Sequence, residues 1–116
     1  MEHDEQVALF EWASMQECVY PELRLLHAIP NGGWRGWKTG KYLKAEGVKP
    51  GVPDICLPVS RGAYHGLYVE MKFDKNDLTP NQQSWVLALR QQGYDVVVCW
   101  SFEEARAAIL AYLGET

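Results

Sequence analysis

The pattern of apolar and polar residues predicts a helix at each end of the chain. Residues from about His3 to Val19 are rich in helix formers and present a broad apolar face, as expected of a helix that packs on a sheet. Pro21 is predicted to end this helix. At the other end, Ser101 is predicted to cap an amphipathic segment that carries apolar residues along one side as far as Leu113.

A third helix is predicted within LTPNQQSWVLALRQQG, residues 78–93. Thr79 suits the N-cap, Pro80 suits the first helical position, and Gly93 supplies the C-terminal stop. Gln82 lies three residues after Thr79 and completes the capping-box pattern.

Short apolar runs between the helices predict strands. They are LRLLHAIP (23–30), residues 54–59, LYVEMK (67–72) and DVVVCW (95–100). The turn at 61–66 predicts a hairpin, and the basic, aromatic stretch 34–46 predicts a loop with a short helix that ends at Gly47. The order helix, strand, short helix, strand, strand, helix, strand, helix predicts an α/β fold with a mixed β-sheet flanked by helices.

Length and composition are those of one globular domain spanning residues 1–116. No apolar run approaches the roughly 20 residues that cross a bilayer, and the acidic N-terminus is unlike a secretion signal. The three cysteines, Cys18, Cys56 and Cys99, are odd in number and lack C-x-x-C spacing. We therefore expect a cytoplasmic protein with reduced, buried thiols and no zinc site.

Charge is distributed unevenly along the chain. The net charge is −4, yet the stretch from Asn31 to Lys75 holds eight basic residues against four acidic ones, a local charge of +4. A basic centre within acidic flanks is typical of a cleft that faces phosphates, although a solvated lysine-rich helix would have the same composition.

Three residues whose side chains suit metal binding or catalysis lie on the predicted hairpin. Strand periodicity places Glu70 and Lys72 on one face of LYVEMK, and antiparallel pairing brings Asp54 near them. Two neighbouring carboxylates repel each other unless a cation such as Mg²⁺ or Mn²⁺ lies between them. Such an ion polarises a phosphoryl oxygen and acidifies water, and an ammonium group stabilises the developing charge. By itself E-x-K is more often an exposed cross-strand charge pair.

The order of these motifs is more specific than any one of them. G-V-P-D, fifteen residues, E-M-K and then L-T-P-N-Q-Q-S-W resemble the PD-(D/E)-x-K nuclease superfamily, and more closely the virus-type replication-repair nuclease (VRR-NUC) domain family. The resemblance covers most of the chain and includes the P-N-G-G turn at 30–33. It implies a restriction-endonuclease-like fold and cleavage of DNA that depends on Mg²⁺ or Mn²⁺. For short stand-alone members it implies a homodimer acting on branched DNA, such as Holliday junctions, in viral or prophage replication, recombination or repair.

The resemblance also implies roles for individual residues. Asp54 and Glu70 would bind metal, the carbonyl of Met71 would be a further ligand, and Lys72 would be the catalytic lysine. Gln82 matches the family's helix glutamine near the active site, and its alternative role is the capping box.

Further residues are expected near the metal or the DNA. The family has a glutamate on the first helix near the metal. Glu2 fits this position slightly better than Glu5, and the alternative for both is stabilisation of a helix N-terminus. Basic residues interleaved with tryptophans suit contacts with DNA phosphates and bases. These basic residues are Arg35, Lys38, Lys41 and Lys44.

The sequence therefore favours a metal-dependent DNA endonuclease with selectivity for branched structures. One alternative is a nucleic-acid-binding module of the same fold that has lost cleavage. The other is a structural or partner-binding subunit without a nucleic-acid role.

Overall fold

The computed structural model describes residues 2–30 and 44–114 of the chain. Its helices and strands, in chain order, are α1 (Glu2–Met15), the 3₁₀ helix η1 (Pro21–Leu25), β1 (His27–Ala28), β2 (Ile55–Leu57), β3 (Leu67–Met71), α3 (Pro80–Gln91), β4 (Asp95–Cys99) and α4 (Phe102–Tyr112).

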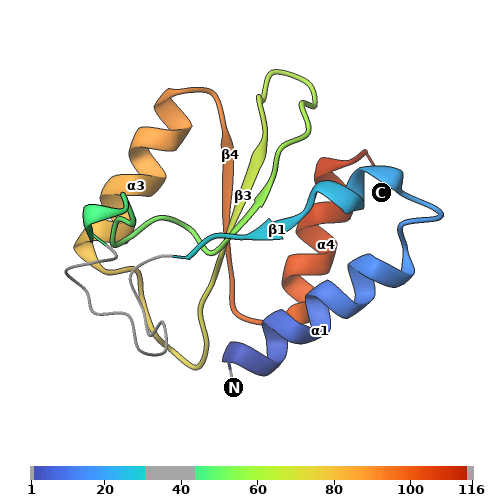
Figure 1. Ribbon diagram of the computed structural model, residues 1–116, viewed down its shortest axis with the longest axis horizontal. Coiled ribbons are helices and arrows are strands. Elements are labelled where there is room, and N and C mark those ends of the chain that lie inside the picture. The colour runs from blue at the N-terminus through green and yellow to red at the C-terminus, as the bar shows by residue number, and fades with distance from the viewer. Residues whose placement is uncertain (1, 31–43, 115–116) are drawn as a thin grey trace.

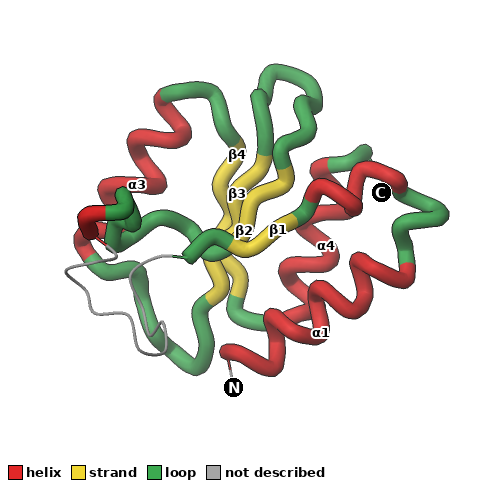
Figure 2. Tube along the Cα trace, viewed as in Figure 1, coloured by secondary structure: helices red, strands yellow, loops and turns green. Residues whose placement is uncertain are grey.

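The strands form one sheet in the order β1-β2-β3-β4 (Figure 2). β1 pairs with β2, and β2 with β3, in antiparallel orientation, whereas β3 and β4 are parallel. The sheet separates α3 on one side from α1 and α4 on the other (Figure 1). The predicted α/β fold with a mixed sheet is confirmed. Most of the expected helix within 34–46 lies outside the described residues.

Alternating side chains of the strands build two apolar layers. Leu9, Val69 and Ile109 belong to the layer between the sheet and the pair α1 and α4. Val86 and Val96 belong to a smaller layer beneath α3. Because successive strand residues point to opposite faces, the even-numbered residues of β3 and β4 face α3. This alternation determines which polar side chains lie beneath α3.

The predicted strand at residues 23–30 is wrong over most of its length. Pro21 opens η1, and Leu23 is buried within this short helix. Proline favours a first helical position, and burial of one leucine stabilises the turn without a partner strand. Only His27–Ala28 pairs with β2.

The second predicted strand, at 54–59, is also shorter in the structure. Pro58 has no N–H for a ladder, and the Val59 N–H donates to the carbonyl of Leu57 within a tight turn at 2.9 Å. β2 is therefore limited to Ile55–Leu57.

The strand β4 forms one edge of the sheet, and β1 forms the other. The odd-numbered residues of β4 bond to β3, so the Val96 carbonyl points away from the sheet. The Arg90 guanidinium of α3 donates to this carbonyl at 2.8 Å. A side chain thereby occupies one edge position that another strand would otherwise use.

Two of the three cysteines follow the prediction. Cys56 and Cys99 are buried free thiols, whereas Cys18 is exposed. Cys18 follows the end of α1 in a turn where it is exposed, so the expectation of a buried thiol is wrong there. Across the described part of the chain, no helix combines the length and apolar character that crossing a membrane requires.

Candidate active site

The register of the hairpin brings the two predicted acids together. Ile55 pairs with Val69, so one further step along the ladder places Asp54 directly opposite Glu70. Directly opposed residues point to the same face, with Cβ atoms about 4.5–5.5 Å apart. The Asp54 Oδ2 accepts a hydrogen bond from the Met71 N–H at 2.8 Å. The predicted convergence of the two acids is therefore present in the fold.

The proline before Asp54 changes the hydrogen bonding at the end of β3. The same register places Pro53 opposite Met71, where an antiparallel ladder would exchange two hydrogen bonds. Pro53 has no N–H to donate, and the Met71 N–H bonds to the Asp54 carboxylate instead. N–H and C=O of a strand residue point to the same side, so the Met71 carbonyl also faces the segment that leads into β2. The P-D dipeptide thus brings the Asp54 carboxylate to the end of β3, next to Glu70 and Met71 in the register.

Glu70 is a buried acid, with 2% of its surface exposed. It lies on the face covered by α3, where the Gln82 Nε2 donates to its Oε2 at 3.1 Å. An ionised carboxylate needs such polar partners when it is removed from water. Its burial rules out the alternative that Glu70 and Lys72 form an exposed cross-strand charge pair.

Gln82 connects the helix cap with the acid and the lysine. Its Oε1 accepts from the Thr79 N–H at 2.9 Å and from the Lys72 Nζ at 3.1 Å. The Gln82 N–H donates to the Thr79 hydroxyl at 3.2 Å, which completes a capping box. The sequence presented the cap and the site as alternatives for Gln82, and in the structure its side chain completes the cap and also bonds to Glu70 and Lys72. Both ends of its amide have a partner, so its orientation is fixed.

A close backbone contact joins the two halves of this cluster. Gly51 lies three residues before Asp54 and packs against Asn81, the residue before Gln82. A Cβ on Gly51 would lie 2.7 Å from the carbonyl carbon and oxygen of Asn81, and Gly51 has a φ of +94°. Only glycine fits this position without strain. The separation between the Asp54 loop and the N-terminus of α3 is therefore set by this contact.

The remaining predicted site residues are not brought into this cluster by the described contacts. Glu5 accepts from the Phe102 N–H at 2.8 Å and so stabilises the start of α4. Glu2 is the first residue of α1, and its side chain lies outside the description. Lys44 is exposed. Arg35, Lys38 and Lys41 lie outside the described residues.

The donor set fits a hard divalent cation. Asp54 and Glu70 supply carboxylate oxygens and Met71 supplies a carbonyl oxygen, the ligand types of Mg²⁺ and Mn²⁺. Within residues 2–30 and 44–114, no group of three His, Cys, Asp or Glu side chains could hold a metal. An ion here would depend on two carboxylates, one carbonyl and water, which is the usual way in which proteins hold Mg²⁺.

A hollow of about 340 Å³ lies beside this cluster. It is lined by Asp77, Leu78, Gln83, Val98 and Trp100. Sequence reasoning treated these residues as parts of a helix start and a strand end, because nothing local in the sequence shows that they enclose a space.

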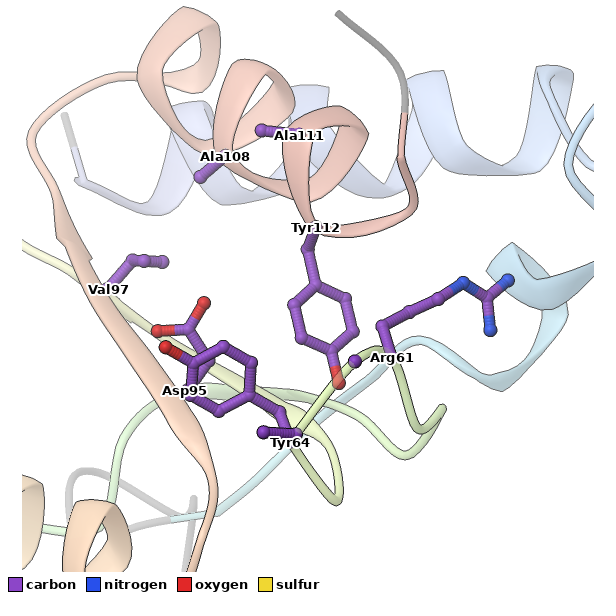
Figure 3. A pocket seen from close by; sticks show the side chains of 9 residues that line it. Arg61, Tyr64, Asp95, Val97, Ala108, Ala111 and Tyr112 are labelled. Atoms are coloured by element: carbon purple, nitrogen blue, oxygen red, sulfur yellow. The ribbon is translucent and has the colours of Figure 1, made fainter.

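A second hollow, of about 400 Å³, lies between β4, α4 and the turn at 61–64 (Figure 3). Arg61, Tyr64, Asp95 and Tyr112 are among the residues that line it, and the Arg61 guanidinium pairs with Glu22. The Tyr112 hydroxyl donates to the Val59 carbonyl. This hollow is on the opposite face of the sheet from Glu70 and contains none of the predicted site residues.

Comparisons with known proteins bear on the family and the fold of the chain. The sequence profile of the VRR-NUC domain family matches residues 2–103. A solved structure described as a VRR_NUC domain protein superimposes with a TM-score of 0.81 and 31% sequence identity, covering 99% of this chain and 91% of that one. A search of the curated proteins found no match.

Proposed function

Because the chain belongs to the VRR-NUC domain family, which implies a nuclease-type function, we propose that it is a divalent-metal-dependent DNA endonuclease. The observation that carries this proposal is the hydrogen-bonded series from Glu70 through Gln82 to Lys72, with Asp54 opposite Glu70. Carboxylates that can hold a metal ion, beside an amine that can stabilise developing charge, are groups that metal-dependent phosphodiester hydrolysis uses.

Each residue of the cluster has a defined role in this proposal. Asp54, Glu70 and the Met71 carbonyl would hold Mg²⁺ or Mn²⁺, which when bound supplies Lewis-acid activation of phosphate and water. The Lys72 ammonium stabilises the negative charge that develops on the phosphate oxygens. Gln82 fixes the direction of Lys72 by accepting its hydrogen bond, so the amine is preorganised before substrate arrives.

The proposed substrate is branched DNA, cut by a homodimer. Two copies related by a two-fold axis would place two sites on a symmetric junction. The resemblance of the motifs supports this assignment. The DNA phosphates would be neutralised by the basic residues Arg35, Lys38, Lys41 and Lys44.

Substitution of Lys72 tests the catalytic proposal. With Mn²⁺, labelled junctions, flaps and plain duplexes are offered to the wild type and to Lys72→Ala. We expect the variant to cleave about 10²–10³-fold more slowly under saturating conditions, because one preorganised charge is lost, while DNA binding persists. Arg106→Ala is the matched control: it also removes one positive charge, but from α4, where Arg106 lies over the Phe102 ring.

The outcomes separate the alternatives. Wild-type protein that binds junctions but cuts nothing with Mn²⁺ or Mg²⁺ would be an inactive binding module. Undiminished cleavage by Lys72→Ala would remove Lys72 from the mechanism. Light scattering during size-exclusion chromatography, with and without a four-way junction, measures the mass, and a monomer in both would contradict the homodimer.

A further inference from the structure

We propose that the hollow lined by Asp77, Leu78, Gln83, Val98 and Trp100 binds one unstacked base of the DNA strand next to the bond that is cut. This inference rests on the proposed nuclease function and specifies its substrate: DNA with a nucleotide that can leave the helical stack beside the scissile phosphate.

The hollow lies next to Glu70 and Gln82. Val98 is the register partner of Glu70 across β3 and β4, one strand spacing of about 4.8 Å away. Both point to the α3 face, and Trp100 follows Val98 with the same alternation. On the helix side, Gln83 is adjacent in sequence to Gln82. The hollow is therefore lined by residues of α3, which carries Gln82, and of β4, which pairs with the strand of Glu70.

The hollow has an aromatic ring in its wall. Trp100 is 38% exposed, which is unusual for so large an apolar side chain. Its ring is nevertheless held in place, because its Nε1 donates to the Asn76 carbonyl at 3.1 Å. Its backbone N–H donates to Glu104 at 3.0 Å. A flat ring that is both exposed and oriented is suited to stacking, and every nucleobase offers a flat π-face.

The charges around the hollow determine which part of a nucleotide would bind in it. Asp77 contributes a carboxylate to the wall, which would repel a phosphate group. Lys72, directly after the neighbouring strand β3, attracts phosphate instead. The backbone of the DNA would therefore pass Lys72 while a base occupies the hollow between Leu78 and Trp100.

This arrangement requires a base that is outside the double-helical stack. Unstacking costs a few kcal/mol within an intact duplex and least where a nucleotide is already unpaired. A branch point supplies such a nucleotide. The hollow therefore gives a physical reason for preferring branched DNA that requires no reading of base sequence.

The decisive measurement is whether the effect on cleavage of removing the Trp100 ring depends on the effect of removing one DNA base. Branched DNAs are prepared with one abasic nucleotide at successive positions on each side of the cut, and single-turnover cleavage is measured with Mn²⁺. For the wild type we expect one abasic position to lower cleavage about 5- to 150-fold, the range that corresponds to loss of one base–aromatic stack. Trp100→Ala should show the same loss on intact DNA and no further loss on the abasic DNA. Trp100→Phe, which keeps a flat ring, should recover most of the activity.

Controls separate stacking from damage to the fold. Tyr64→Ala removes an exposed aromatic ring from the second hollow, on the other face of the sheet, and should cleave and respond to the abasic site as the wild type does. Urea unfolding verifies that each variant is folded. The proposal is overturned if Trp100→Ala cleaves intact DNA normally, or if its loss and the abasic loss simply multiply at every position.

Failure of the nuclease proposal has a distinct signature. If wild-type protein cuts none of the DNAs, the same double comparison is made on binding, by fluorescence anisotropy with Ca²⁺. Coupling between Trp100 and one abasic position would then support the base site without cleavage, and its absence would refute the base site as well.

Discussion

The contact between Gly51 and Asn81 provides a sharp test of how the site is assembled. In Gly51→Ala, the new Cβ would lie 2.7 Å from two backbone atoms of Asn81, whereas ordinary contact begins at 3.4 Å, so the Asp54 loop and α3 must separate by roughly 0.7 Å. The residue also keeps its φ of +94°, which an alanine adopts at a cost of about 1–2 kcal/mol.

A matched control lies in the same loop. Gly47 has a φ of +95°, and a Cβ there would meet nothing within 4 Å. Gly47→Ala therefore reports the backbone strain alone, about 1–2 kcal/mol. Gly51→Ala adds overpacking of about 1–3 kcal/mol, and its displacement of Gln82 relative to Asp54 should lower kcat by roughly 10- to 100-fold.

Two measurements check this prediction. Urea unfolding compares the free energies of unfolding of both variants with the wild type, and single-turnover cleavage of a junction compares their rates. Equal stabilities for the two variants would refute the packing argument. Normal cleavage by Gly51→Ala, despite lowered stability, would show that the Asp54 loop and α3 need no fixed separation.

Three other predictions concern the cap and the cysteines. Thr79→Ala should lower the free energy of unfolding by about 1 kcal/mol and slow junction cleavage, whereas Thr79→Ser, which keeps the hydroxyl, should restore both in the same urea and cleavage assays. Burial, and secondarily the charge of Glu104, raises the pKa of the Cys99 thiol to about 11 from 9.0, so its ionisation opposes folding. The stability contributed by the neutral thiol is complete below about pH 9 and is lost between about pH 9 and 11. In urea titrations over this range, the free energy of unfolding of Cys99→Ala should fall by roughly 2–3 kcal/mol less than that of the wild type. An equal fall in both proteins would contradict the raised pKa of Cys99. Cys18 should react with maleimide in native protein while Cys56 reacts only after unfolding, and mass spectrometry showing native labelling of Cys56 would contradict its burial.

Local patterns were sufficient to predict the parts of the fold that carry their own signals. Thr79 and Ser101 are N-caps as expected, because a cap depends on a side chain and a backbone a few residues apart. The pairing of Asp54 with Glu70 was likewise predictable, since a hairpin determines its own register.

Other features depend on contacts that no local pattern contains. The run LRLLHAIP has strand-like composition, but the burial of Leu23 in η1 decides its structure. The role of Gln82 depends on where α3 is placed on the sheet, so its two interpretations could not be resolved beforehand. The signal that could have linked them is Gly51, since a glycine three residues before Asp54 indicates a close backbone approach.

The way in which the sheet ends has a consequence for self-association. An exposed edge strand is a template for pairing with other chains and is the common origin of aggregates. Here one edge, β1, is only two residues long, and on the other the Val96 carbonyl is already taken by Arg90. An incoming strand would have to displace that guanidinium to extend the sheet. The shortness of β1 and the bond from Arg90 to Val96 therefore hinder strand pairing at the two edges of the described sheet, and Arg90 does so from α3, the helix that carries Gln82 near its other end.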